Sequence, residues 1–384
     1  MTARRLAWLL RFLASGHGLL TIGASAAAGL AVGMLPNLAQ AVPSVGGKWW
    51  WLALVAIGSV VVFAVCATLL YGREGVGIVL LVGEDGWDTT RLIAMRNNAL
   101  QRHPSCFTVN VSELLGPYGP GSPNSQSRPD AAPDRVRFAH RVMQARMLEE
   151  GQAPEQVSLY VTARHVDAYR LGGLLRDQRH PSLSLMMFSR EQGVGIVEAL
   201  RLHSGLTQQP DARDLELLRD VLLRDPQSEG PEWVPFALPG GVTARRVAIV
   251  LPMAGHNAGM QEESLAAARD GRSERYRFPG QAEIPERCAG GLVFATRPGN
   301  VPDRREIFEA LVRYVNHHWQ QKLSEMRANG DSSLRGWLFT DGPVEVVVAL
   351  GNVLGRQTEL VSWGPPPDGP GTHAGSGTGS GGGR

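Results

Sequence analysis

The residues most able to do chemistry in this chain follow short apolar runs that predict buried strands. Thr162, Arg164 and His165 come after the run Val157–Val161. Comparable residues follow three later runs: His256, Asn257, Thr296, Arg297, Thr340 and Asp341. Because loops and helix N-termini converge beyond the carboxyl ends of parallel strands, these residues are candidates for a ligand site. Guanidinium groups bind phosphate in a bidentate manner, so the arginines favour a phosphate-bearing ligand, with solvent-facing loop residues as the alternative.

The sequence lacks the common motifs of nucleotide chemistry and of hydrolysis. It contains no GxxxxGK[ST], no GxGxxG with an acidic partner, no GxSxG and no HExxH. We therefore predict no catalytic residue, no cofactor and no metal, and we favour a binding protein. The alternative is a membrane-anchored α/β enzyme acting on nucleotides or phosphoesters. It would use the acidic loop of Glu84, Asp85 and Asp88 with His165 or His256.

The pattern of apolar runs predicts an α/β fold. Strands are expected at Val76–Val82, Val157–Val161, Leu183–Phe188, Val247–Leu251, Leu292–Ala295, Trp337–Phe339 and Leu360–Trp363. Helical periodicity covers Thr89–Gln101, Asp134–Glu150, Val166–Asp177, Asp211–Leu223, Arg304–Met326 and Val344–Leu354. Apolar strands that alternate with helices imply largely parallel sheets covered on both faces. The similar openings Val76-Gly-Ile-Val-Leu and Val247-Ala-Ile-Val-Leu suggest two Rossmann-like halves.

The N-terminal region predicts a transmembrane hairpin. Its two apolar runs, at about 12–35 and 49–71, are long enough for helices that cross a bilayer. Arginines flank the outer ends of the hairpin, and the connection between the runs carries only Lys48. The positive-inside rule then places both termini and the large domain in the cytoplasm, with the protein in the bacterial inner membrane. Ala39-Gln40-Ala41 resembles a signal cleavage site, so cleavage of the first span stays open.

One face of the first predicted span carries only small residues. Thr21, Ser25, Gly29 and Gly33 are spaced four apart. Such a stripe lets helices approach closely. It predicts either packing against the second span or self-association between chains.

The remaining organisation follows from composition. We expect the hairpin at 1–72 and the α/β domain at 73–363, with halves at about 73–230 and 240–363. The Pro/Gly/Ser-rich stretch 116–133 predicts a mobile loop, and 364–384 a disordered tail. The three cysteines are far apart in the sequence and suggest no disulfide framework and no thiolate metal site. The formal net charge of +2 argues neither for nor against binding to nucleic acid.

The C-terminal stretch is the most specific soluble segment. It reads Gly336-Trp-Leu-Phe-Thr-Asp-Gly-Pro-Val-Glu-Val-Val-Val-Ala-Leu-Gly, followed by Thr358-Glu-Leu-Val-Ser-Trp363. This succession of strand, Gly-Pro turn, helix and strand resembles the end of a SAVED domain, the cyclic-oligonucleotide sensor of bacterial CBASS anti-phage systems. The resemblance covers about thirty residues of the printed sequence. Similarity to a membrane-anchored CARF protein of a CRISPR system stays open.

The resemblance implies a fold, a ligand and a function. The fold would be two fused CARF-like halves, and Thr340, Asp341, Gly342 and Pro343 would line or shape the ligand pocket. Two spans followed by such a sensor resemble the two-transmembrane SAVED effectors of CBASS. These are thought to bind a nucleotide messenger and to damage the membrane. The implied partners are a cyclic di- or trinucleotide, the lipid bilayer and further copies of the chain, and no DNA or RNA duplex is expected.

Overall fold

The computed structural model describes residues 25, 28, 29, 54, 55, 57–65, 75–82, 89–115, 134–149, 156–176, 183–189, 195–237, 245–257, 259–279, 286–328 and 334–363. The chain divides into two compact units. The first contains Met1–Gly77 and Asn98–Cys106, and the second contains Ile78–Asn97 and Phe107–Arg384. Both sheets described below are built mainly of residues of the second unit.

The first sheet has five strands in the order β2-β1-β3-β4-β5. Their bounds are β1 (Val76–Val82), β2 (Ser105–Asn110), β3 (Val157–Ala163), β4 (Leu183–Phe188) and β5 (Ile196–Leu202). β3 and β4 are parallel, with Val157 opposite Leu183, whereas β5 pairs antiparallel with β4 at the edge. The continuous apolar runs of β1, β3 and β4 are almost wholly buried, as expected for strands covered on both faces.

The second sheet also has five strands, in the order β11-β10-β7-β9-β6. Their bounds are β6 (Glu232–Pro235), β7 (Arg246–Leu251), β9 (Cys288–Val293), β10 (Arg335–Thr340) and β11 (Thr358–Leu360). β10 is parallel to β7 and β11, and β7 is parallel to β9. Only β6, at the edge, runs antiparallel to its neighbour.

The two sheets share one topology. Numbered in chain order within each half, β2-β1-β3-β4 and β9-β7-β10-β11 both read 2-1-3-4. The apolar repeats at Val76 and Val247 open the first strand of each half, β1 and β7. The prediction of two Rossmann-like halves with largely parallel sheets is therefore confirmed at the level of the fold class.

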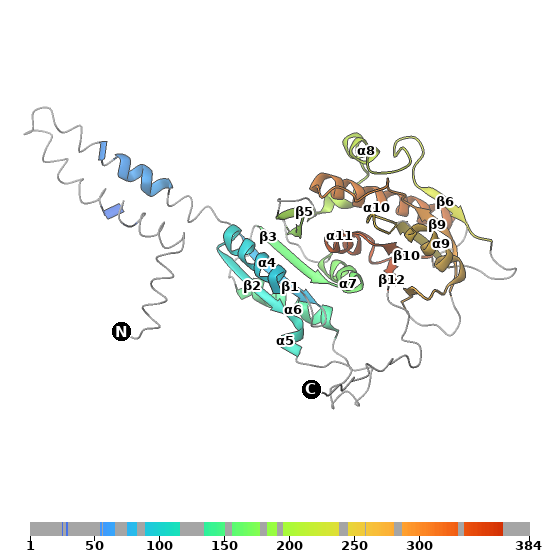
Figure 1. Ribbon diagram of the computed structural model, residues 1–384, viewed down its shortest axis with the longest axis horizontal. Coiled ribbons are helices and arrows are strands. Elements are labelled where there is room, and N and C mark those ends of the chain that lie inside the picture. Colours follow the sequence, from blue (N-terminus) through green and yellow to red (C-terminus); the bar gives the residue numbers. More distant parts are fainter. Residues whose placement is uncertain are drawn as a thin grey trace, which may run out of the picture. The chain divides into compact units, whose positions relative to one another are not determined.

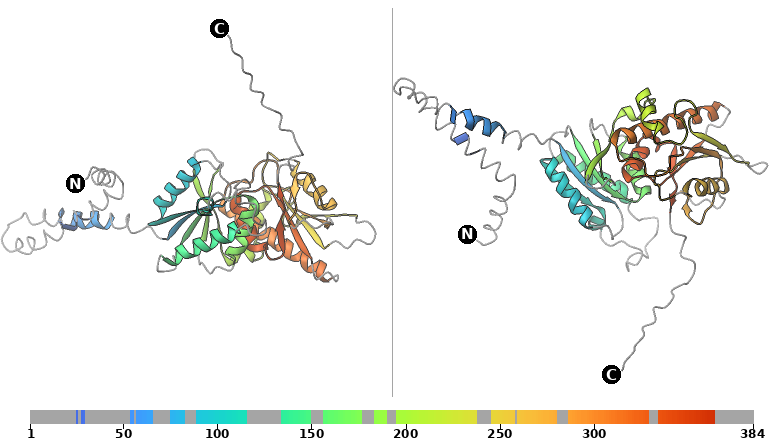
Figure 2. Two further views of the ribbon diagram at one scale, coloured as in Figure 1. Left: turned by 90° about the horizontal axis from the view of Figure 1, so that it is seen from below. Right: turned by 45° about the horizontal axis from the view of Figure 1, so that its top comes forward.

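Helices cover both faces of each sheet. Those of the first half are α4 (Thr89–Arg102), α5 (Val111–Leu115), α6 (Arg135–Glu149) and α7 (His165–Leu175). The later ones are η2 (Ser204–Thr207), α8 (Ala212–Arg219), α9 (Met260–Asp270), α10 (Arg305–Ala328) and α11 (Val344–Leu354). In Figures 1 and 2, α4 and α6 lie on opposite faces of the first sheet, and α9 and α10 on opposite faces of the second. The pair α7 and α11 lies between the sheets.

The helices α7 and α11 cross at two glycines. Each of these, Gly172 and Gly351, is the eighth residue of its helix. A Cβ on Gly172 would lie 1.9 Å from the Val348 carbonyl oxygen, and one on Gly351 would lie 2.1 Å from that of Tyr169. Tyr169 and Val348 are in turn the fifth residues of the two helices. The crossing is thus symmetric, and it requires glycine on both sides because backbone meets backbone.

The last predicted strand, Leu360–Trp363, is corrected by the structure. Thr358–Leu360 forms β11 of the main sheet, whereas β12 (Ser362–Trp363) leaves it and pairs antiparallel with β8 (Tyr276–Arg277). The strands β2, β5 and β6 and the helix α9 were not among the predicted elements. The two edge strands β5 and β6 are only partly buried, so they lack the continuous apolar signal of the inner strands.

Most of the predicted hairpin lies outside the described residues, as do Thr21, Gly33, the loop 116–133 and the tail 364–384. Ser25 and Gly29 are helical and exposed. Residues 57–65 are also helical, and most of their large apolar side chains are exposed, for example Ile57 and Val60. In the part of the chain that the structure describes, no helix is both long enough and apolar enough to cross a membrane.

Candidate ligand cleft

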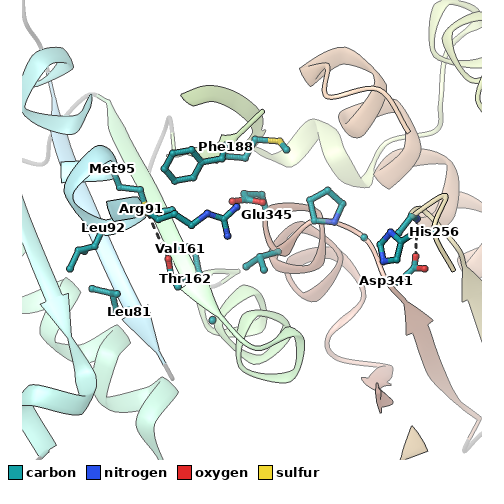
Figure 3. A pocket seen from close by; sticks show the side chains of 16 residues that line it. Leu81, Arg91, Leu92, Met95, Val161, Thr162, Phe188, His256, Asp341 and Glu345 are labelled. Atoms are coloured by element: carbon teal, nitrogen blue, oxygen red, sulfur yellow. Dashed lines mark hydrogen bonds between the residues drawn. The ribbon is translucent and has the colours of Figure 1, made fainter. Parts of the chain in front are cut away.

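A cavity of about 300 Å³ lies where the carboxyl ends of the two sheets meet (Figure 3). Leu81 at the end of β1 and Thr162 at the end of β3 line it from the first half. His256 and Asp341, which follow β7 and β10, line it from the second half. In a 2-1-3-4 sheet the chain leaves strands 1 and 3 in opposite directions, and ligands bind at that switch point. The cavity therefore lies at the switch points of both halves.

A larger cavity of about 810 Å³ adjoins the first one. The two share Ala163, His256, Asp341 and Val344, and we call them together the cleft. The larger cavity brings together most of the residues predicted from the sequence: Arg164, His165, His256, Asn257, Thr340 and Asp341. Gly342 and Pro343 line the smaller cavity. The N-terminal ends of α7 and α11 both border the cleft, where helix backbone N–H groups favour anions.

Asp341 connects the loops that follow β7 and β10. Its Oδ1 accepts hydrogen bonds from the backbone N–H of Met253, at 2.7 Å, and of Ala254, at 3.1 Å. Its Oδ2 is buried and has no hydrogen-bond partner among the described residues. The neighbouring Gly342 N–H donates to Thr340 Oγ1 at 3.2 Å, and a Cβ at Gly342 would collide with the Met253 sulfur. These contacts fix the second-half wall of the cleft.

His165 and Arg164 form the opposite wall. Burial lowers the pKa of His165 below its ordinary value, while the charge of Asp341 and a hydrogen bond with the Gly342 backbone oppose that shift. His165 is therefore mainly neutral at pH 7 and able both to donate and to accept a hydrogen bond. Arg164 Nε lies 3.1 Å from Asp167 Oδ2, yet the Arg164 side chain is 63% exposed and within reach of a ligand.

Two predicted site residues, Thr296 and Arg297, lie outside the cleft lining. Thr296 Oγ1 donates to the Pro252 carbonyl at 2.8 Å. Arg297 donates to the backbone carbonyls of Leu222, at 3.2 Å, and Arg219, at 3.1 Å. Both residues follow β9, which lies beside β7 on the side away from β10 and therefore away from the switch point. We leave them out of the candidate site.

Several cleft residues were not found from the sequence. The larger cavity includes Tyr276, Arg277 and Trp363 of the β8–β12 ribbon. Two-residue strands leave no periodic signal, so nothing in the sequence placed them together. Arg91 lies in the first turn of α4, after β1, and the rule of strand ends could have found it. Its guanidinium lies over the Phe188 ring, 5.2 Å from the ring centroid, and points toward Glu345 (Figure 3).

The acidic loop of the alternative enzyme hypothesis, with Glu84, Asp85 and Asp88, lies outside the described residues. Among the residues that are described, no group of three His, Cys, Asp or Glu side chains could hold a metal ion.

Comparison with known proteins gives structural matches only. No protein-family model and no curated protein sequence matches the chain. The Cap4 SAVED/CARF-domain receptor of Acinetobacter baumannii with the cyclic trinucleotide 3'3'3'-cAAA is 12% identical, with a TM-score of 0.39 over 81% of this chain and 56% of that one. The same receptor with 2'3'3'-cAAA gives 11% and 0.38, over 81% and 55%.

The Cap4 receptor of Moraxella osloensis is 10% identical, with a TM-score of 0.32 over 80% of this chain and 53% of that one. This chain thus spans about half the length of these receptors. Because these TM-scores are low, the fold is assigned from this chain's own strand order.

Proposed function

We propose that this chain is a membrane-anchored effector that binds a cyclic di- or trinucleotide in the cleft. The observation that carries the proposal is the meeting of two switch points at one cleft. In α/β sheets this is where nucleotides and other phosphate-bearing ligands bind. A cleft built from two such points presents binding groups from both halves to one ligand.

The lining suits a compact ligand with several phosphates and bases. Arg91, Arg164 and Arg277 supply guanidinium groups at different places around the two cavities. Arginine pairs with phosphate in a bidentate manner, and the ends of α7 and α11 add backbone donors. Trp363 is 67% exposed at the larger cavity and offers a stacking surface for a base. His256 and Asn257 supply polar groups for base edges.

The membrane part of the proposal rests on the N-terminal sequence and on residues 57–65. A helical stretch with exposed Ile57, Val60 and Val61 is unfavourable in water, because moving apolar side chains out of water lowers the free energy. A bilayer would cover them. We propose an inner-membrane protein with both termini in the cytoplasm. Ligand binding would bring copies together, and the small-residue stripe of the first span would pack between chains and disrupt the membrane.

A ligand screen tests the proposal. The full-length protein, purified in detergent, is heated with each member of a panel of cyclic di- and trinucleotides. A ligand at a hundred times its Kd should stabilise the protein by about 2.7 kcal/mol, seen as a raised Tm. The same ligand should release dye from liposomes that contain the protein.

Matched variants then locate the site. His256→Ala and Asn257→Ala should each weaken ligand binding by about tenfold, because each removes a polar contact in the cleft. Arg297→Ala serves as the control, since its side chain binds carbonyls away from the cleft, and it should leave the affinity unchanged. If no cyclic nucleotide raises the Tm of a folded sample, the sensor proposal is wrong. Binding without dye release would contradict only the membrane step.

A further inference from the structure

The carboxylate of Asp341 belongs to the wall that the two cavities of the cleft share, since Asp341 lines both of them. Its Oδ1 accepts the backbone N–H groups of Met253 and Ala254, so this oxygen already has its partners within the protein. Its Oδ2 is the only buried side-chain oxygen without a hydrogen-bond partner among the residues that the structure describes. A buried acceptor without a donor is costly, so a donor supplied by a ligand would stabilise this oxygen.

The position of Oδ2 is fixed by the contacts of the rest of the turn. Rotation of the Asp341 carboxylate would break both hydrogen bonds of Oδ1, at 2.7 and 3.1 Å. The next residue, Gly342, packs so closely on Met253 that a Cβ there would collide with the Met253 sulfur. The turn after β10 therefore holds one unpartnered carboxylate oxygen in a defined place, which is what selective binding of a ligand group requires.

The smaller cavity of the cleft has the lining of a base site rather than of a phosphate site. Its charged lining residues are one arginine, Arg91, and two acids, Asp341 and Glu345. The Arg91 guanidinium points toward Glu345 (Figure 3), so the cavity has no excess of positive charge for a phosphate. The apolar part of the lining consists of Leu81, Leu92, Met95, Val161, Met187 and Phe188, among others. A flat, uncharged ring suits such a cavity.

The burial of Oδ2 restricts which donor of a base can reach it. An exocyclic amino group projects from the edge of a base, whereas a ring N–H is set back between its neighbours. Adenine carries such an amino group and, alone among the common bases, has no carbonyl oxygen. The carbonyl oxygens of guanine, cytosine and uracil carry partial negative charge, which the carboxylates of Asp341 and Glu345 would repel. The wall therefore favours adenine.

From this arrangement we propose that Asp341 determines base specificity: its Oδ2 accepts a hydrogen bond from the amino group of an adenine of the ligand. This inference deepens the proposed function of the cleft and rests on it. The phosphates would lie in the larger cavity, where Arg277 is exposed and forms no ion pair within the part of the chain that the structure describes. A cyclic nucleotide holds its bases outside the ring of phosphates, so one base can enter the smaller cavity while a phosphate stays at Arg277.

Calorimetric titration of the full-length protein in detergent tests the inference. The probes are c-di-AMP and cyclic triadenylate, and each is compared with its counterpart that carries hypoxanthine in place of adenine. Hypoxanthine has the same rings but a carbonyl oxygen where adenine has the amino group. We expect the adenine form to bind about tenfold tighter or more, because the hypoxanthine form loses a hydrogen bond to a charged group.

Asp341→Asn is the variant that separates base recognition from a structural role. Its amide oxygen must face the N–H groups of Met253 and Ala254, so its amide nitrogen takes the place of Oδ2 and presents a donor. The preference for adenine over hypoxanthine should therefore fall by about tenfold or more. Asp225→Asn is the matched control, because Asp225 Oδ1 also accepts a backbone N–H, from Gln227 at 3.1 Å, but does not line the cleft. It should leave both affinities unchanged.

Failure of this inference can be told apart from failure of the proposed function. A merely structural role of Asp341 would weaken both members of a pair by the same factor, so an unchanged ratio in Asp341→Asn would overturn the inference. Equal affinities of the native protein for the adenine and hypoxanthine forms would also overturn it, as would tighter binding of c-di-GMP or c-di-UMP than of both adenine probes. In each of these cases the cleft still binds a cyclic nucleotide. If no cyclic nucleotide raises the Tm of the folded protein, both proposals are wrong.

Discussion

The two halves of this protein share a strand order and differ in the turns after their third strands. After β3, Arg164 and His165 face the cleft, and Arg164 is largely exposed. After β10, Asp341 binds two backbone N–H groups of the neighbouring loop, and Thr340 and Gly342 are buried. One turn therefore offers groups to a ligand, and the other mainly holds the wall in place. A duplicated scaffold with different turns gives a cleft whose two sides have different chemistry.

Where the halves are alike, at the crossing of α7 and α11, substitutions should have their largest effect. Gly172→Ala and Gly351→Ala should each lower the free energy of unfolding by about 2–3 kcal/mol, because the new methyl group would collide with backbone. Equal losses in chemical denaturation would support a symmetric crossing. Gly173→Ala is the control. A Cβ at Gly173 would lie 3.9 Å from the Gly351 carbonyl oxygen, which is an ordinary contact. We therefore expect the free energy of unfolding to stay the same or to rise by up to about 1 kcal/mol. A loss of stability in only one of the two glycine variants would contradict a symmetric crossing.

Where the halves differ, at the two turns, the expected effects are unequal. Asp341→Ala should lower the free energy of unfolding by about 2 kcal/mol, since the N–H groups of Met253 and Ala254 lose their acceptor. Asp341→Asn keeps an acceptor oxygen and should lose less. Arg164→Ala, at the exposed turn of the first half, should change stability by no more than about 0.5 kcal/mol. Denaturant titration of the three variants measures this, and equal losses at both turns would contradict the division of roles.

The smallest expected effect at neutral pH concerns the helices after the second strands, α6 and α10. Burial lowers the pKa of His318 in α10 to about 4, with help from His317, and burial also lowers the pKa of His140 in α6. Below pH 6.5 the unfolded chain then binds more protons than the folded chain, so stability falls as the pH drops from about 6.5 toward 4. His318→Gln should flatten this decline more than His140→Gln, measured by urea titration across that range. An unchanged slope in both variants would show that other groups cause it.

The sequence predicted the inner strands because they are buried on both faces. Val76–Val82 and Val247–Leu251 are continuous apolar runs, and their side chains are almost wholly buried in the structure. Alternation with helical periodicity was enough for the fold class. The antiparallel edge strands β5 and β6 escaped prediction because partial burial breaks up their apolar pattern.

The lining of the candidate cleft could be predicted in part, and its role as a binding site stays a prediction. Residues after the first and third strands of each half could be chosen by the rule of strand ends, and Arg164, His256 and Asp341 do line the cleft. The same rule chose Thr296 and Arg297, which the structure places away from it.

The sequence by itself determined the inner strands and most of the long helices, because continuous apolar runs and helical periodicity are local patterns. It also determined the apolar character of the N-terminal runs. Only the tertiary structure decided which strand ends meet, because the order of strands in a sheet does not follow their order in the chain. That order puts β9 beyond β7 and so removes Thr296 from the cleft. A separate ribbon of two-residue strands pairs Trp363 with Tyr276, and both line the larger cavity.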